Sequence, residues 1–207
     1  GYAATEVKEF YDTRTKEEAI GNTMARVYSI KTVTHEPHWL TGYLIPKWCT
    51  RIHTRGTGFI LRGNLMVTNY HVVQEYHESN YGNNELVIRD ENMDEIDAYI
   101  CKYDKDKDIC AILLSNHTGS VKEMAIRETN IHLGENVIAV SMANSDEVHH
   151  VTYGHINHRF IDEDDNPMHS TNIHIPHGFS GSPLIDTDGK LIGMNTTSYS
   201  PENHMSA

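Results

Sequence analysis

Three segments of this 207-residue chain hold side chains whose types could perform nucleophilic catalysis together. They are Met66-Val-Thr-Asn-Tyr-His71-Val-Val, Asp106-Lys-Asp108-Ile-Cys-Ala-Ile-Leu-Leu and His177-Gly-Phe-Ser180-Gly-Ser-Pro183. A serine hydroxyl is a weak nucleophile at neutral pH, so it needs a neutral imidazole to accept its proton. The imidazole in turn needs a carboxylate to fix its tautomer. The segments supply a histidine, an acid and a serine in that order.

The local sequence suits each of these residues to a site. His71 and Asp108 each sit at the end of an apolar strand, and Ser180 lies in a glycine-flanked turn whose backbone N–H groups could converge on one oxygen. Asp104 and Asp106 compete with Asp108 for the role of the acid. We favour Asp108, because it directly precedes the apolar run 109–114 and can therefore be buried.

The surrounding elements are predicted to be β-strands with almost no helix between them. Short β-branched and aromatic runs are broken by Gly, Asn and Asp, which favours an all-β fold of closed or sandwiched antiparallel sheets. A polar stretch at 115–120 separates two β-rich halves. Ahead of them, Thr15-Lys-Glu-Glu18 has the pattern of a capping box and predicts a short helical arm. The predicted strands cover 24–34, 58–61, 65–68, 85–89, 95–103, 108–114, 136–141, 148–160, 172–175, 183–185 and 190–196.

Taken together, the motifs resemble those of the chymotrypsin-like (trypsin-fold) serine proteases, and more closely those of the HtrA/Deg branch. The likeness rests on the three segments above, on Leu133-Gly-Glu-Asn-Val-Ile-Ala-Val and on Asp188-Gly-Lys-Leu-Ile-Gly-Met-Asn-Thr, and it runs with gaps from about Gly56 to Thr196. It implies two six-stranded antiparallel β-barrels with the site in the cleft between them. The expected boundaries are 1–22 for the arm, 23–120 for the first barrel and 121–207 for the second.

The resemblance also implies a function, that of a serine endopeptidase acting on protein or peptide substrates through an acyl-enzyme. By this resemblance, His71 is the general base, Asp108 is the acid that orients it and Ser180 is the nucleophile. The resemblance also implies that the N–H groups of Gly178 and Ser180 form the oxyanion hole. No metal or other cofactor is implied. The chain departs from the pattern in two places. Phe179 stands where the secreted digestive members have an aspartate, and Ser182 replaces a glycine, as in several viral chymotrypsin-like proteases.

In this family the primary specificity pocket is bounded by the stretch before the nucleophile and by the strand after it. Here these stretches contribute His174, His177, Asn195 and Ser198, which are donors rather than apolar groups. Burying a large aliphatic side chain against them would leave polar groups without partners. We therefore expect cleavage after acidic or amide residues.

Other readings of the same residues stay open. A catalytically idle trypsin-fold module that binds peptides, and an esterase that uses the same three residues, are both compatible with the motifs. A metal site built from His149-His150, His155 and His158 is conceivable, but no cysteine or carboxylate stands at ligand spacing, so a solvated hairpin is favoured.

The composition of the chain limits the kinds of binding partner and the cellular location that we expect. The formal charge of −12 disfavours nucleic acid, and no apolar stretch approaches the length of a membrane helix. Cys49, Cys101 and Cys110 are an odd number without C-x-x-C spacing, and no signal-peptide pattern is present, so we expect free thiols and a cytoplasmic location. Only eleven residues follow Thr196. We therefore expect a longer chain or a partner chain to supply the closing strand of the second barrel.

Overall fold

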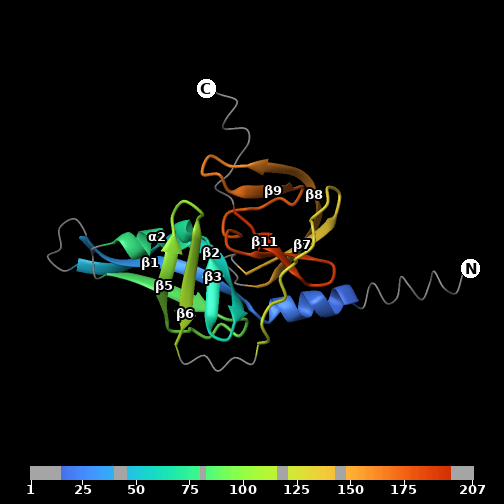
Figure 1. The fold of residues 1–207 in the computed structure, drawn as a ribbon. Coiled ribbons are helices and arrows are strands. Elements are labelled where there is room, and N and C mark those ends of the chain that lie inside the picture. Colours follow the sequence, from blue (N-terminus) through green and yellow to red (C-terminus); the bar gives the residue numbers. More distant parts are fainter. Residues whose placement is uncertain (1–14, 40–45, 80–82, 116–120, 143–147, 197–207) are drawn as a thin grey trace, which may run out of the picture.

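The structure is a computed structural model, and it describes residues 15–39, 46–79, 83–115, 121–142 and 148–196. Of residues 36–39 and 46–49, only the backbone is described. Figure 1 shows two curled sheets side by side, with a helix over residues 15–24 running along the second.

All strand pairs within the two sheets are antiparallel. The first sheet has six strands in the order β4-β1-β2-β3-β6-β5, and the second has five in the order β11-β10-β7-β8-β9. The prediction of an all-β fold with two antiparallel sheets is confirmed, and the boundaries at 22 and 120 stay predictions. The strands of the first sheet are β1 (Val27–Trp39), β2 (Pro46–Arg62), β3 (Leu65–Thr68), β4 (Asn84–Arg89), β5 (Ala98–Asp104) and β6 (Ile109–Leu114). Those of the second are β7 (Asn136–Ser141), β8 (His150–Ile161), β9 (Pro167–Thr171), β10 (Pro183–Asp186) and β11 (Leu191–Met194).

Buried apolar side chains form three clusters, one inside each sheet and one between them. Ile60, Met66 and Ile112 belong to the first sheet's cluster, and Val137 and Ile156 belong to the second sheet's. The cluster between the sheets takes members from β1, β2, β7 and β10 and from the segments at 124 and 142. Its buried residues are Val27, Phe59, Met124, Ile138, Val140, Met142 and Ile185. The two sheets are thus joined by a shared apolar core, which fixes their relative position.

Among the described residues, helix α2 (Tyr70–Glu78) is the helix that the sequence pattern did not predict. The adjacent β-branched residues Val72 and Val73 favour a strand locally, but both are fully buried under the first sheet together with Tyr70. Tertiary packing outweighs local propensity here. His71 therefore lies in the first turn of a helix, and the expectation that it ends a strand is wrong.

Two strands differ from their predicted ranges. Strand β9 covers Pro167–Thr171, whereas the alternating pattern predicted one at 172–175. Ile173 and Ile175 do pack into the second sheet's core, but from the segment that leads to Ser180 rather than from a ladder. Strand β2 begins at Pro46, well before the predicted start at 58. The sequence pattern missed this part of the strand because residues 50–57 show no alternation of apolar and polar side chains.

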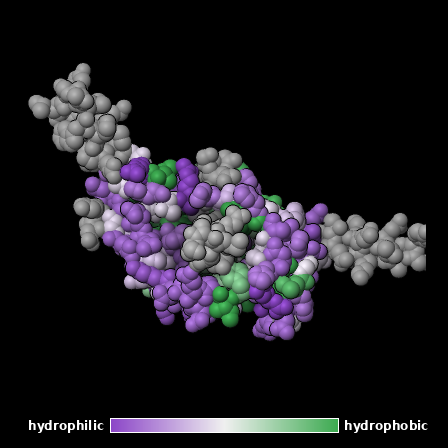
Figure 2. All heavy atoms as spheres, turned by 90° about the horizontal axis from the view of Figure 1, so that it is seen from above, coloured by the Kyte–Doolittle hydropathy of each residue, from purple (hydrophilic) through white to green (hydrophobic). Residues whose placement is uncertain are grey.

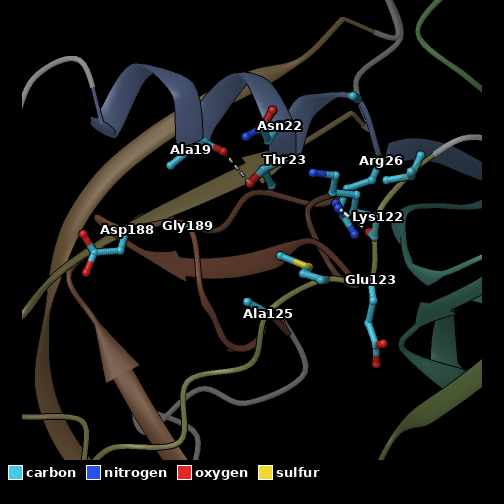
Figure 3. Close-up of a pocket in the computed structure, with 12 residues that line it drawn as sticks. Ala19, Asn22, Thr23, Arg26, Lys122, Glu123, Ala125, Asp188 and Gly189 are labelled. Carbon is cyan, nitrogen blue, oxygen red and sulfur yellow. Dashed lines mark hydrogen bonds between the residues drawn. The ribbon is translucent and has the colours of Figure 1, made fainter.

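The helix over residues 15–24 confirms the predicted arm, and its residues Ile20 and Met24 cover the core between the sheets. Beside it lies a pocket of about 400 Å³, bounded by residues 121–125 and 188–189. Figure 3 shows this pocket under the helix, with the hydrogen bond from Thr23 Oγ1 to the carbonyl of Ala19 (2.8 Å) on its wall. None of the predicted catalytic residues lines it.

The face seen in Figure 2 is mostly hydrophilic, with apolar residues scattered in small groups. Within the described ranges, no helix is both long and apolar enough to cross a membrane. The second sheet has five strands among the described residues, and residues 197–207 lie outside them. The closing strand from a longer chain or a partner therefore stays a prediction.

Candidate active site

His71 and Asp108 face each other where α2 begins and β6 starts. His71 Nδ1 lies 2.6 Å from Asp108 Oδ2, and Asp108 Oδ1 accepts the backbone N–H of His71 at 2.8 Å. Because a carboxylate only accepts hydrogen bonds, Nδ1 carries the proton of the neutral ring. The Nε2 atom is left with a lone pair, which is what a general base needs.

The backbone of Asp108 is held as firmly as its side chain. Its carbonyl accepts hydrogen bonds from the N–H of Tyr70 (3.2 Å) and from Nδ2 of Asn69 (2.9 Å), and its own N–H donates to the carbonyl of Lys105 (3.2 Å). Its φ is 54°, in the left-handed region that aspartate and asparagine tolerate better than most residues. The tight turn before β6 therefore aims the carboxylate at His71.

The two competing aspartates have other partners. Oδ1 of Asp104 accepts the backbone N–H of Lys107 at 3.0 Å, which closes the turn. The carbonyl of Asp106 accepts a hydrogen bond from the side-chain amide of Asn166 (3.1 Å), so the β8–β9 turn is tied to this loop. Of the three aspartates, Asp108 is the one whose carboxylate bonds to His71.

Ser180 is the second residue of the second of two consecutive type II turns, which share Phe179. In the first, the N–H of Phe179 donates to the carbonyl of Pro176 (3.1 Å), and Gly178 has a φ of 95°. In the second, the N–H of Ser182 donates to the carbonyl of Phe179 (3.1 Å), and Gly181 has a φ of 90°. A type II turn requires a positive φ at its third residue, which explains why glycine occupies both positions.

Thr57 of β2 fastens this double turn to the first sheet. Its N–H donates to the carbonyl of Ser180 (2.9 Å) and its hydroxyl to the carbonyl of Gly178 (3.0 Å). Its own carbonyl accepts the hydroxyl hydrogen of Thr68 (2.7 Å), the last residue of β3. Since His71 follows three residues after Thr68, the same contacts bring the serine turn and the histidine to one junction.

Most of the backbone N–H groups around Ser180 already donate hydrogen bonds within the protein. The N–H groups of Phe179, Gly181 and Ser182 are used inside the turns or by Asn195. The N–H of Gly178 has no hydrogen-bond partner among the described residues, and Gly178 and Ser180 are both buried. An unused N–H in a buried turn next to a serine hydroxyl is suited to bind a negatively charged oxygen.

The predicted pocket residues fall in different surroundings. His174 and His177 are exposed on the segment before Ser180. Asn195 is 8% exposed and directs its amide at Ser182. Ser198 lies outside the described residues. A role in substrate binding stays a prediction for all four.

The clustered histidines of the second sheet do not converge. His149 Nε2 lies 3.1 Å from the carbonyl of Val27, the ring of His150 lies against Phe179 at 5.8 Å, and His158 stacks on Phe160. Across the described part of the chain, no group of three or more His, Cys, Asp or Glu side chains could hold a metal ion.

Sequence reasoning missed Thr57, Thr68 and the partners of Ser182. A threonine between two glycines at 56–58 is the available signal for Thr57, since such small neighbours permit close backbone approach. Its contacts with Gly178, 121 positions away, depend on how the two sheets pack, which a local pattern does not encode.

Comparisons with known proteins agree with this architecture. The family model described as Trypsin-like peptidase domain matches residues 56–194. The solved structure titled Crystal structure of Deg5 superposes with a TM-score of 0.70 over 90% of this chain and 86% of that one, at 18% sequence identity. At that identity the match speaks for the fold alone.

Curated relatives are similar over the same region. Serine protease HTRA3 of Rattus norvegicus is 30% identical over 148 residues, 68% of this chain and 32% of that protein. Protease Do-like 1, chloroplastic, of Arabidopsis thaliana is 28% identical over 155 residues, 70% of this chain and 34% of that protein. A probable periplasmic serine endoprotease DegP-like of Rickettsia conorii is 30% identical over 154 residues, 70% of this chain and 29% of that protein. The matched region therefore spans about a third of these relatives.

Proposed function

We propose that this chain, which belongs to the trypsin-like peptidase domain family, is a serine endopeptidase that works through an acyl-enzyme intermediate. The observation that carries the proposal is the contact between His71 and Asp108, combined with the double turn that holds Ser180. Both carboxylate oxygens are used on His71, so the imidazole has the tautomer that can accept a proton at Nε2.

In the proposed reaction, His71 Nε2 takes the proton of the Ser180 hydroxyl as its oxygen attacks the substrate carbonyl. The negative charge that forms on the carbonyl oxygen is bound by the N–H groups of Gly178 and Ser180. The imidazolium, stabilised by Asp108, then protonates the leaving amine and the acyl-enzyme remains. A water molecule, deprotonated by the same imidazole, releases the acid and regenerates the serine.

A fluorophosphonate probe separates this proposal from an idle peptide-binding module, because it reacts only with an activated serine. Labelling should occur in the native chain and be absent in Ser180→Ala. Half-buried Ser170 on β9, whose hydroxyl donates to Asn157 Oδ1 (2.7 Å), provides the control, since Ser170→Ala should label like the native chain. Turnover of esters without turnover of peptides would instead support the esterase. Absence of labelling in the native chain would exclude both enzymes.

We further propose that the exposed His177 and His174 beside the serine turn favour an acidic or amide residue before the scissile bond. These imidazoles offer hydrogen-bond donors to a carboxylate or amide oxygen. We expect a peptide library to show Glu, Asp, Gln or Asn at this position. The ratio of kcat/KM for Glu over Gln should be a few-fold at most, because no lysine or arginine lies at 174–178.

The matched control for this prediction is His132→Ala, which removes an exposed histidine whose backbone N–H donates to Glu135 (3.1 Å). His177→Ala should reduce the acidic preference, and His132→Ala should leave it unchanged. Strong cleavage after Leu, Val or Phe that persists in His177→Ala would contradict the proposed specificity.

A further inference from the structure

We propose that Ser182 and Asn195 form a hydrogen-bond relay that orients and polarises the backbone N–H of Ser180. The inference rests on the proposed function, in which this N–H is one of the two oxyanion donors. Both residues would then be positioning residues that act on the reacting atoms through the peptide group between Phe179 and Ser180.

The first link is the contact between Ser182 and Phe179. Ser182 is fully buried, and its hydroxyl donates to the carbonyl of Phe179 at 2.6 Å. That carbonyl and the N–H of Ser180 belong to one peptide group. Since no peptide bond of the described chain is cis, the two groups point in opposite directions in one plane. Holding the carbonyl therefore aims the N–H at the other side of the turn.

The second link fixes the direction of the relay. Asn195 Nδ2 lies 3.1 Å from the Ser182 carbonyl oxygen and 3.1 Å from the Ser182 hydroxyl oxygen. A carbonyl only accepts, so the amide nitrogen, not the amide oxygen, must face it. The Ser182 hydroxyl thus accepts from Asn195 and keeps its own hydrogen for Phe179.

The backbone holds Asn195 in place for this task. Its N–H donates to the carbonyl of Ser182 (2.8 Å), and its carbonyl accepts the N–H of Gly181 (2.9 Å). The chain of donors runs from the Asn195 amide through the Ser182 hydroxyl to the Phe179 carbonyl. In a buried site each bond polarises the next, which makes the N–H at the far end of the peptide group a stronger donor.

The relay needs the hydroxyl of Ser182, which a glycine at this position would lack. A donor that is oriented before the reaction needs no reorganisation when charge develops on the substrate oxygen. The relay therefore supplies a side-chain support for the oxyanion turn in a chain where Phe179, and not an aspartate, precedes the nucleophile.

The test compares Ser182→Ala and Ser182→Gly with the native chain, and uses Thr23→Val as the control for loss of a buried hydroxyl outside the site. Loss of a whole oxyanion donor lowers kcat by about 100- to 1,000-fold, so misorientation of one should lower it about tenfold, with KM within about twofold. A peptide aldehyde, whose adduct carries the oxyanion, should bind more weakly by the same factor. Ser182→Gly guards against a variant that fails to fold, because glycine fits the turn.

An amide NMR spectrum separates failure of the relay from failure of the proposed function. The Ser180 N–H resonance should move upfield in both Ser182 variants and stay in place in Thr23→Val, whether or not the chain cleaves peptides. An unchanged resonance, or an unchanged kcat in an active enzyme, would overturn the relay. A purely structural role would lower the melting temperature and leave kcat of the folded fraction unaltered.

Discussion

Ser180→Ala is expected to reduce kcat for peptide hydrolysis by about 10⁶-fold, and His71→Ala by a similar factor, because both remove the proton transfer that activates the nucleophile. The double variant should be hardly slower than either single one, since the members of the proposed triad act as a unit. The measurement is kcat with a fluorogenic peptide, accompanied by circular dichroism to establish that each variant is folded.

The control for this prediction is Ser170→Ala, at a half-buried serine of β9, which should keep full activity. Multiplication of the two single losses in the double variant would contradict the assignment, because it would mean that Ser180 and His71 act in separate steps. Residual hydrolysis from the oxyanion donors and substrate binding alone should remain measurable above the rate in water.

The second large effect is expected for Asp108→Asn. Asp108 accepts from two donors of His71, and asparagine has one acceptor oxygen to replace two. The backbone N–H of His71 cannot become an acceptor, so the amide oxygen should stay with it and the NH₂ group should face Nδ1. This forces the ring proton to Nε2, where it blocks proton transfer from Ser180. We expect kcat to fall about 10⁴-fold with the fold intact.

Proton and nitrogen NMR of His71 provides the direct measurement, because the two tautomers have distinct ring-nitrogen shifts. Asp108→Ala serves as a comparison. Like the asparagine variant it removes the carboxylate, but alanine lacks the polar side chain that makes the left-handed backbone at this position tolerable, which adds about 1–2 kcal/mol of backbone strain. The alanine variant should therefore lose melting temperature where the asparagine variant does not. Equal stabilities, or an Nδ1–H tautomer in Asp108→Asn, would speak against this account.

The fold class and the segments that meet at the site could be predicted from the sequence, and the reasons are local. Short runs of β-branched residues separated by Gly, Asn and Asp favour strands joined by turns. In the serine segment, the glycines mark the positions that need a positive φ. The helix at 70–78 could not be predicted, because its first residues are buried by distant strands that override a strand-like Tyr-His-Val-Val.

The contacts inside the site were harder still to predict. Asn195 had the residue type for a pocket-lining amide, yet its donors are used on Ser182, and nothing in the local pattern distinguishes these two possibilities. Thr57 joins the sheets through hydrogen bonds to residues more than 120 positions away, which exist only once the core between the sheets has formed.

The left-handed backbone at Asp108 also bears on how such a chain can evolve. An aspartate codon is one base change from asparagine and from glycine, the two residues that accept this backbone without strain. Either change removes the carboxylate from His71 while the turn before β6 keeps its shape. Most other single-base changes at this codon would also lower the stability of the fold, because the new residue would be strained in the left-handed region. Natural selection for a peptide-binding module without hydrolysis thus has an easy route at this position, and idle descendants of this chain should carry Asn or Gly there.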